Sequence, residues 1–214
     1  MLIMIIGISG GRGAGKSTLS RRLAEILPNT LLIIVDDYMH ESSKNLEVQI
    51  FNNLGIKKEP KIFSYNYFFK DFESVKVWIA TIEDEVMNRI ETEIENNKEK
   101  EYVIIDWCFL PLCKFFEKCD YTICLTADFK VREQRVTKRL LYKDVSLYNR
   151  NDIPLNNYMP EMYVNSIKYT DLSGHGYNFD YNLQNNSSMK DFNRQINQLA
   201  EDFSIQKYKK YRIV

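Results

Sequence analysis

The stretch that decides the fold is residues 7–20, GISGGRGAGKSTLS, which holds five of the eight glycines of the chain. Glycine loses backbone entropy when it is ordered, so such a cluster indicates positive φ angles or a ligand that approaches the main chain closely. Gly10, four further residues and then Gly15-Lys16-Ser17 match the Walker A pattern. In this pattern successive backbone N–H groups surround phosphate oxygens. The stretch therefore predicts a phosphate-binding loop.

The flanks of this loop supply the strand and the helix that the pattern requires. Residues 2–8 form an apolar run of strand length, which is typical of a strand buried on both faces. Residues 17–27 place their leucine and isoleucine side chains on one stripe, as an amphipathic helix does. A glycine-rich turn without a ligand is the alternative, and the matching strand and helix argue against it.

We predict that this loop binds ATP and Mg²⁺ as cofactors. Lys16 is expected to reach the β- and γ-phosphates, and the Ser17 hydroxyl is expected to bind Mg²⁺. The nucleotide-binding residues predicted in this way are Gly10, Gly11, Gly13, Ala14, Gly15, Lys16, Ser17 and Thr18.

Apolar runs and amphipathic patterns alternate along the rest of the chain. Strand-like runs occupy residues 31–35, 102–107, 121–125 and 179–183, and helical patterns occupy residues 73–96, 128–142, 160–170 and 189–203. This alternation predicts an α/β fold of the three-layer P-loop NTPase kind, with a parallel sheet of about five strands flanked by helices and a small lid. Ligands of such sheets bind beyond the carboxyl ends of the strands.

Length favours one domain over residues 1–214, with an acceptor-binding segment at about residues 57–100 and a lid at about residues 128–158. Equal numbers of basic and acidic residues, 29 of each, give no net charge, which argues against nucleic acid as a partner. No apolar segment approaches the length of a bilayer span, so we expect a cytoplasmic protein without a membrane partner. We expect a monomer or a weak homo-oligomer that acts on a small-molecule acceptor.

Acidic residues follow two of the predicted strands at their carboxyl ends. Asp36 and Asp37 come directly after residues 31–35, and Asp106 lies near the end of the next strand along the chain. A carboxylate one strand away from the phosphate loop can accept the proton of an acceptor hydroxyl or hold a magnesium-bound water. We therefore predict that Asp36 is the catalytic base and that Asp106 and Asp37 join Ser17 in the metal site. Capping of a helix or turn is the alternative for each acid.

Basic residues cluster in the predicted helix that contains KVREQRVTKR. On a helix, Arg132, Arg135 and Arg139 share one face. Guanidinium groups that close over the γ-phosphate neutralise the charge that spreads over its oxygens during transfer. We predict that Arg135 and Arg139 form the catalytic set together with Lys16 and Asp36. A solvated helix face is the alternative for any single arginine.

The opening of the chain resembles the P-loop kinases of small metabolites, in the branch that holds uridine kinase, nicotinamide riboside kinase and dephospho-CoA kinase. The resemblance is carried by residues 5–18, IIGISGGRGAGKST. Val35-Asp36-Asp37-Tyr38 is similar to the segment of the nucleoside kinases in which the first acid is the base for a ribose 5′-hydroxyl. The resemblance implies an ATP-dependent phosphotransferase with an alcohol group as acceptor.

The middle and the tail of the chain resemble dephospho-CoA kinase in the order of their segments, notably residues 102–110 (YVIIDWCFL) and residues 182–192 (NLQNNSSMKDF). The His-Pro pair of that family is missing from the long helix, where this chain has Glu83-Asp84, and its Gly-Asp-x-x-Arg-type segment is missing as well. On this resemblance we favour dephospho-CoA as the acceptor, which implies a step of coenzyme A biosynthesis. Uridine, cytidine or nicotinamide riboside is the alternative acceptor.

The predicted acceptor contacts are aromatic side chains and one arginine, namely Tyr38, Tyr65, Phe68, Phe69 and Arg150. The aromatic rings are expected to stack on a base or a pantetheine arm, and a small satellite core is the alternative. Arg150 is expected to bind the pyrophosphate of the acceptor. A regulatory P-loop switch that transfers phosphate only to water is the alternative from another functional class.

Overall fold

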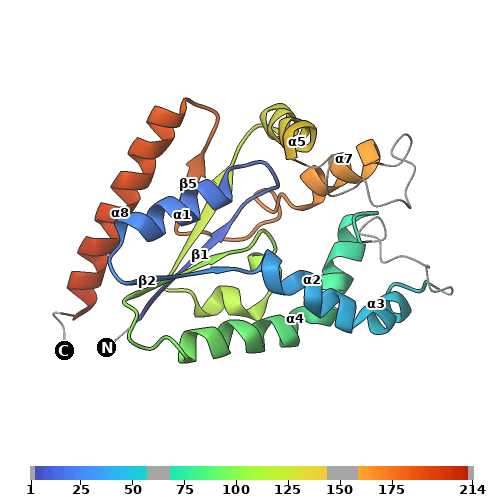
Figure 1. The fold of residues 1–214 in the computed structure, drawn as a ribbon, viewed down its shortest axis with the longest axis horizontal. Helices are drawn as coiled ribbons and strands as arrows, with labels where there is room; N and C mark the ends of the chain where they lie inside the picture. The colour runs from blue at the N-terminus through green and yellow to red at the C-terminus, as the bar shows by residue number, and fades with distance from the viewer. Residues whose placement is uncertain (1–2, 57–67, 144–158, 212–214) are drawn as a thin grey trace.

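The computed structural model describes residues 3–56, 68–143 and 159–211, which form a five-stranded sheet with helices on both faces (Figure 1). The sheet has the order β2-β3-β1-β4-β5, and each neighbouring pair of strands is parallel. This arrangement confirms the predicted α/β fold with a five-stranded parallel sheet. The strands are β1 (Met4–Ser9), β2 (Thr30–Ile34), β3 (Tyr102–Asp106), β4 (Tyr121–Thr126) and β5 (Tyr181–Gln184).

The helices follow the predicted pattern except in one region. They are α1 (Lys16–Ile26), α2 (Asp36–Asn45), α3 (Glu47–Asn53), α4 (Phe72–Glu95), α5 (Phe129–Lys143), α7 (Met159–Tyr169) and α8 (Met189–Tyr211), with the short 3-10 helices η1 (Leu110–Leu112) and η2 (Lys114–Lys118). The sequence pattern missed α2 and α3. Both are short, and isolated helices of such length are unstable in water, so packing on α4 has to hold them. No helix in the described ranges is long and apolar enough to cross a bilayer.

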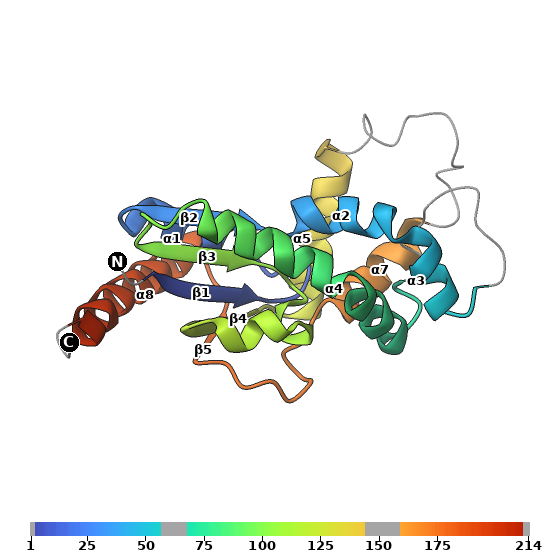
Figure 2. The ribbon, with the colours of Figure 1, turned by 90° about the horizontal axis from the view of Figure 1, so that it is seen from below.

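Each face of the sheet has its own hydrophobic core. On one face α1 and α8 pack together over the strands, with Leu19, Leu23 and Phe192 fully buried (Figure 2). On the other face α2, α3 and α4 cover the sheet around Trp78 and Phe109, which are also fully buried. Burying each such side chain contributes about 2 kcal/mol, so both cores hold the sheet rigid beneath the loops at its edge.

Strand register brings the predicted site residues to one edge of the sheet. Asp106, the last residue of β3, lies opposite Ile8 of β1 and Ile34 of β2. The glycine-rich loop leaves the sheet after β1, and α2 begins with Asp36 two residues after Ile34. The predicted acceptor segment and lid are described only in part, because residues 57–67 and 144–158 lie outside the described residues.

Candidate active site

The loop between β1 and α1 adopts a backbone that requires glycine, as Gly13 and Gly15 show. Gly13 has a φ of 84° and Gly15 a φ of 108°, both in the region that side chains rarely adopt. A Cβ at Gly13 would lie 2.7 Å from the backbone oxygen of Arg132, and one at Gly15 would lie 2.5 Å from Nδ2 of Asn185. The loop is therefore packed against its surroundings as well as bent, and it keeps its shape through these contacts.

The N-terminus of α1 faces this loop without a side-chain cap. Gly15 occupies the capping position, and no described side chain bonds to the first backbone N–H groups of the helix. The backbone N–H groups of Thr18 and Leu19 already donate to the carbonyl of Gly15. The remaining N–H groups and the positive end of the helix dipole form an anion site next to Lys16.

A cavity of about 380 Å³ opens beside the loop and joins residues from distant parts of the chain. Its polar wall comes from the loop, from the first turns of α1 and α2, and from α5 and α7. Its apolar wall comes from α2, from α4 and from the segments before α4 and after β3. The lining residues are Arg12, Gly13, Gly15, Lys16, Ser17, Asp36, Arg139, Ser166 and Thr170 on the polar side, and Met39, Phe69, Trp78, Cys108 and Phe109 on the apolar side.

The Asp36 carboxyl has a raised pKa in this cavity. Asp36 is exposed by its accessible surface, since the open cavity reaches it, but protein atoms crowd around its carboxyl group. Burial therefore raises its pKa above the ordinary value, and Asp106 and Asp37 act in the same direction. Lys16 and Arg12 oppose this effect with their positive charges. A carboxylate with a raised pKa in a cleft is a better proton acceptor than an ordinary surface aspartate.

Lys16 is held as a cation by the same group of charges. Burial lowers the pKa of Lys16, but the carboxylates of Asp106 and Asp36 act in the opposite direction, and the pKa of Lys16 lies above its ordinary value. Burial also raises the pKa of the Cys108 thiol to about 12, which makes Cys108 a neutral wall of the cavity at neutral pH. The cavity thus pairs a charged lysine with a carboxylate.

Asp106 lies beneath this pair rather than in the cavity wall. Its buried Oδ2 accepts a hydrogen bond of 2.8 Å from the Ser20 hydroxyl of α1. No group of three or more His, Cys, Asp or Glu side chains within the described ranges suits a metal ion. Mg²⁺ in nucleotide sites needs only one or two protein ligands, because phosphates and water supply the rest. Ser17 lines the cavity, and Asp106 is close enough to act electrostatically on Lys16 and Asp36, so both stay candidates for that limited role.

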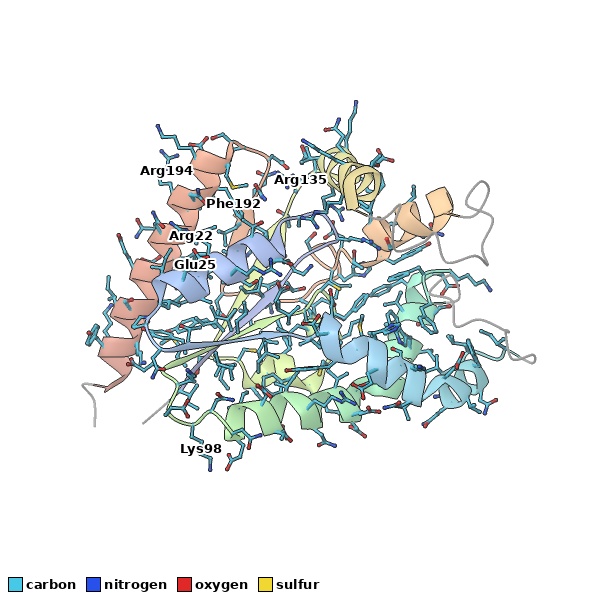
Figure 3. The ribbon with its side chains drawn as sticks, viewed as in Figure 1. Arg22, Glu25, Lys98, Arg135, Phe192 and Arg194 are labelled. Carbon is cyan, nitrogen blue, oxygen red and sulfur yellow. The ribbon has the colours of Figure 1, made fainter. Side chains whose placement is uncertain are left out.

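The two predicted catalytic arginines of α5 have different positions. Arg139 lines the cavity and acts electrostatically on Lys16. Arg135 instead extends from α5 toward the loop before α1 (Figure 3), where its Nη1 donates to the carbonyls of Gly13 and Ala14 at 3.3 Å each. Its Nη2 donates to the Asn185 carbonyl at 3.0 Å. Arg135 lines the neighbouring cavity with Gly15 and Arg139, and the contact of its guanidinium with the transferred phosphate stays a prediction.

Replacing Arg135 with glutamine is expected to raise the KM for ATP about three- to tenfold with little change in kcat. The reason is that the carbonyls of the loop would lose the cation that holds them. A hydrogen bond to a charged group contributes a net of about 1.5–3 kcal/mol, and the two bonds to Gly13 and Ala14 are weaker because they are 3.3 Å long. Steady-state kinetics with varied ATP measures the effect. Lys130→Gln makes the same charge change at an exposed position of α5 and serves as the control. A fall in kcat at constant KM would contradict this role for Arg135.

Three further predicted site residues do not line this cavity. Asp37 and Tyr38 follow Asp36 on α2, where each residue turns about 100° from the one before, so they cannot share its direction. Tyr38 contributes to a separate groove beside Glu85 and Arg89 of α4. Phe68 is fully buried and stacks on Trp78 with ring centroids 4.5 Å apart. The metal contact of Asp37 and the acceptor contacts of Tyr38 and Phe68 therefore stay predictions, without a place in the wall of this cavity.

The remaining predicted residues are one further aromatic residue, two residues outside the described ranges and the residues of the glycine-rich loop. Phe69 lies in the apolar wall of the cavity, as an acceptor contact would. Tyr65 and Arg150 lie outside the described residues. The predicted loop residues Gly13, Gly15, Lys16 and Ser17 line the cavity, Thr18 lines the neighbouring cavities, and Gly10, Gly11 and Ala14 are buried at the base of the loop.

Several cavity residues were not found by sequence reasoning. Arg12 stands at an unspecified position of the Walker A pattern, so the pattern carried no signal for it. Trp78 and Phe109 occur in apolar segments that read as ordinary core. Ser166 and Thr170 are small hydroxyl residues on a helix far along the chain, and only the fold brings them to the loop.

The sheet order, the uncapped helix behind a glycine-rich loop and the lysine–carboxylate pair define a P-loop phosphotransferase domain. Residues 6–152 match the family model described as an AAA domain, and the chain belongs to this family. Within it the chain is a P-loop kinase with an alcohol group as acceptor.

Comparisons with individual proteins agree with this class. The chain is 27% identical to a uridine kinase of Chlamydia pneumoniae over 94% of its own length and 95% of that protein. It is 26% identical to a dephospho-CoA kinase of a Wolbachia species from Brugia malayi over 66% of its own length and 76% of that protein. The solved structure of TT1252 from Thermus thermophilus shares the fold, with a TM-score of 0.63 and 17% identity over 94% of this chain and 98% of that one.

Proposed function

We propose that the protein transfers the γ-phosphate of ATP to a ribose hydroxyl of a nucleoside-containing metabolite. The observation that carries this proposal is the shared cavity of Lys16 and Asp36, which ends in an apolar wall with Phe69 and Phe109. A charged end suits phosphates, and an apolar aromatic end suits a base. A regulatory switch that transfers phosphate only to water would not need the apolar, aromatic end of the cavity.

The transfer step follows from the positions of these side chains. The acceptor oxygen forms a bond to the γ-phosphorus as the bond to the β–γ bridging oxygen breaks, and ADP keeps that electron pair. The acceptor proton passes to the Asp36 carboxylate. Lys16 and Arg139 stabilise the negative charge on the phosphate oxygens, and the backbone N–H groups of the loop hold the donor in line.

Ser17 and Asp106 are the residues that we propose for magnesium, and the bound ion would supply charge neutralisation between the β- and γ-phosphates. Ser17 would be a direct ligand through its hydroxyl. Asp106 is already bonded to Ser20, so it would act by holding water molecules of the ion or by orienting α1. The raised pKa of Lys16 keeps a second positive charge beside this place.

A second cavity, of about 480 Å³, is the proposed place of the adenine base. It shares Gly15 and Arg139 with the first cavity, so one ligand can extend from one into the other. Met189, which is 60% exposed, supplies an apolar surface at its rim. Lys138 and Asn185 complete the opposite side with polar groups.

Two acceptors fit the proposal, and the described part of the cavity favours the smaller. A nucleoside needs a slot for one base and one ribose, and about 380 Å³ is at the small end for ligand pockets. Uridine is also the acceptor named for the relative that aligns over nearly the whole chain. Dephospho-CoA, which the segment order favours, remains the second candidate through the Wolbachia relative.

A screen of uridine, cytidine, nicotinamide riboside and dephospho-CoA with γ-labelled ATP tests the proposal. We expect transfer to a pyrimidine nucleoside with a kcat/KM at least about tenfold above that for dephospho-CoA. A preparation of Lys16→Ala purified in the same way controls for contaminating kinases. Transfer only to dephospho-CoA would select the second candidate, and label released only as inorganic phosphate would contradict the proposed kinase function.

A further inference from the structure

We propose that Arg12 is a further catalytic residue, which contacts the transferring phosphoryl group from the acceptor side of the cavity. The inference rests on the proposed function, because it needs phosphoryl transfer to occur in this cavity. Among the arginines within the described ranges, Arg12 and Arg139 are the two that line it. Arg12 belongs to the glycine-rich loop itself, so its side chain starts beside the phosphate-binding backbone.

The other arginines near the loop are taken up by structural contacts. Arg132 is 4% exposed, its Nη2 lies 2.6 Å from Oδ2 of Asp171, and its Nη1 donates to the Ile167 carbonyl at 2.7 Å. Arg135 is bonded to the carbonyls of the loop.

Arg12 and Arg139 act on different ends of the reacting centre. Arg139 is among the charges that act on Lys16, whereas Arg12 is among those that act on Asp36, together with Lys16, Asp106 and Asp37. Lys16 marks the end of the cavity that we propose for the phosphate donor, ATP. Asp36 is the proposed acceptor of the hydroxyl proton. Arg12 and Asp36 line the same cavity, and the charge of Arg12 acts on the Asp36 carboxyl, so we place Arg12 near the proposed position of the acceptor hydroxyl.

Two hydroxyl residues of α7 and the turn after it hold Arg12 in place. Its backbone N–H donates to Oγ1 of Thr170 at 2.8 Å, and its Nη1 donates to Oγ of Ser166 at 3.2 Å. Thr170 Oγ1 in turn donates to the Ser166 carbonyl at 2.6 Å. The guanidinium is thus positioned before any substrate binds, which is the condition under which a charge lowers a reaction barrier most.

This position suits the charge that moves during transfer. As the bond from the acceptor oxygen to the γ-phosphorus forms and the bond to the bridging oxygen breaks, charge remains on three peripheral oxygens of the γ-phosphoryl group. Lys16 and Arg139 approach from the donor side. A guanidinium on the acceptor side supplies further N–H donors to the same oxygens and can hold two of them at once.

The experiment measures acceptor phosphorylation and slow ATP hydrolysis, in which water replaces the acceptor, for Arg12→Ala and Arg12→Lys. For Arg12→Ala we expect kcat for both reactions to fall about 100-fold, with the KM for ATP changed less than about threefold. Arg12→Lys keeps the positive charge and the fold but lacks the planar guanidinium that can bind two oxygens at once. We therefore expect an intermediate decrease in kcat of about tenfold. Arg194→Ala, at an exposed position of α8, serves as the control for loss of an arginine.

Chemical rescue separates a catalytic guanidinium from a structural one. Millimolar guanidinium is expected to restore part of the kcat of Arg12→Ala and none of that of Lys16→Ala. Ser166→Ala, which removes only the anchor, is expected to lose less than Arg12→Ala. An unchanged kcat in Arg12→Ala, or a loss that guanidinium does not restore, overturns the inference. If the wild-type protein phosphorylates no acceptor, the proposed function is overturned instead. The rate of ATP hydrolysis in the Arg12 variants then still tests the role of Arg12.

Discussion

Lys16→Ala is expected to reduce phosphoryl transfer about a thousandfold or more while the fold stays intact. Lys16 lines the same cavity as Asp36 next to the proposed site of the phosphates, and no other lysine of the described ranges lines that cavity. Alanine removes both the positive charge and the long side chain that carries it. The transition state then loses a hydrogen-bond donor that water cannot replace in the same geometry. Quenched-flow or steady-state transfer of labelled phosphate measures the loss.

The stability of this variant shows whether the effect is local. The pKa of Lys16 lies above its ordinary value in the folded protein. Its positive charge therefore stabilises the folded state at every pH below that ordinary value. This contribution to stability disappears only as the pH rises through the pKa of the folded state. We therefore expect a small decrease in melting temperature for Lys16→Ala at pH 7. Lys130→Ala, exposed on α5, is the matched control. Retained turnover in Lys16→Ala would contradict the assignment of this loop as the donor site.

Asp36→Asn is expected to lower kcat about a hundred- to ten-thousandfold with the KM for ATP nearly unchanged. The amide keeps the shape of the side chain but cannot accept the acceptor proton. In the wild-type protein kcat/KM should rise as Asp36 loses its proton, with an apparent pKa above the ordinary 3.8 because burial disfavours the ionised carboxyl. The acidic limb of the pH–rate profile measures that value, and it should be absent from Asp36→Asn.

The same substitution is expected to stabilise the protein at neutral pH. A carboxyl whose pKa is raised by folding favours the folded state at low pH, and it loses that contribution as the pH rises through the folded pKa. At pH 7 the ionised Asp36 is therefore a cost to the fold, and asparagine removes it. The melting temperature of Asp36→Asn should exceed that of the wild type at pH 7, and the difference should shrink toward pH 4. An unchanged rate with unchanged stability would transfer the role of the base to another acid.

The local arrangement of the donor site was predictable from neighbouring residues. The glycine spacing, the apolar strand before it and the amphipathic helix after it are short-range patterns, and each determines its own segment through backbone sterics and burial. The parallel order of strands and helices followed from the same patterns. Asp36 and Asp106 were predictable candidates because ligands bind at the carboxyl ends of such strands.

The part of the cavity that we propose for the acceptor was decided by tertiary structure alone. Thr170 and Ser166 reach Arg12 across more than 150 residues of sequence, and no periodicity in either segment signals that contact. The sequence pattern places Arg135 and Arg139 on one helix face. Packing of α5 against the loop bonds Arg135 to backbone carbonyls and leaves Arg139 in the cavity wall. Local patterns determine which element forms, because they act through neighbouring backbone and side chains. Which groups of distant elements meet depends on how those elements pack, and packing sums weak contacts over the whole chain.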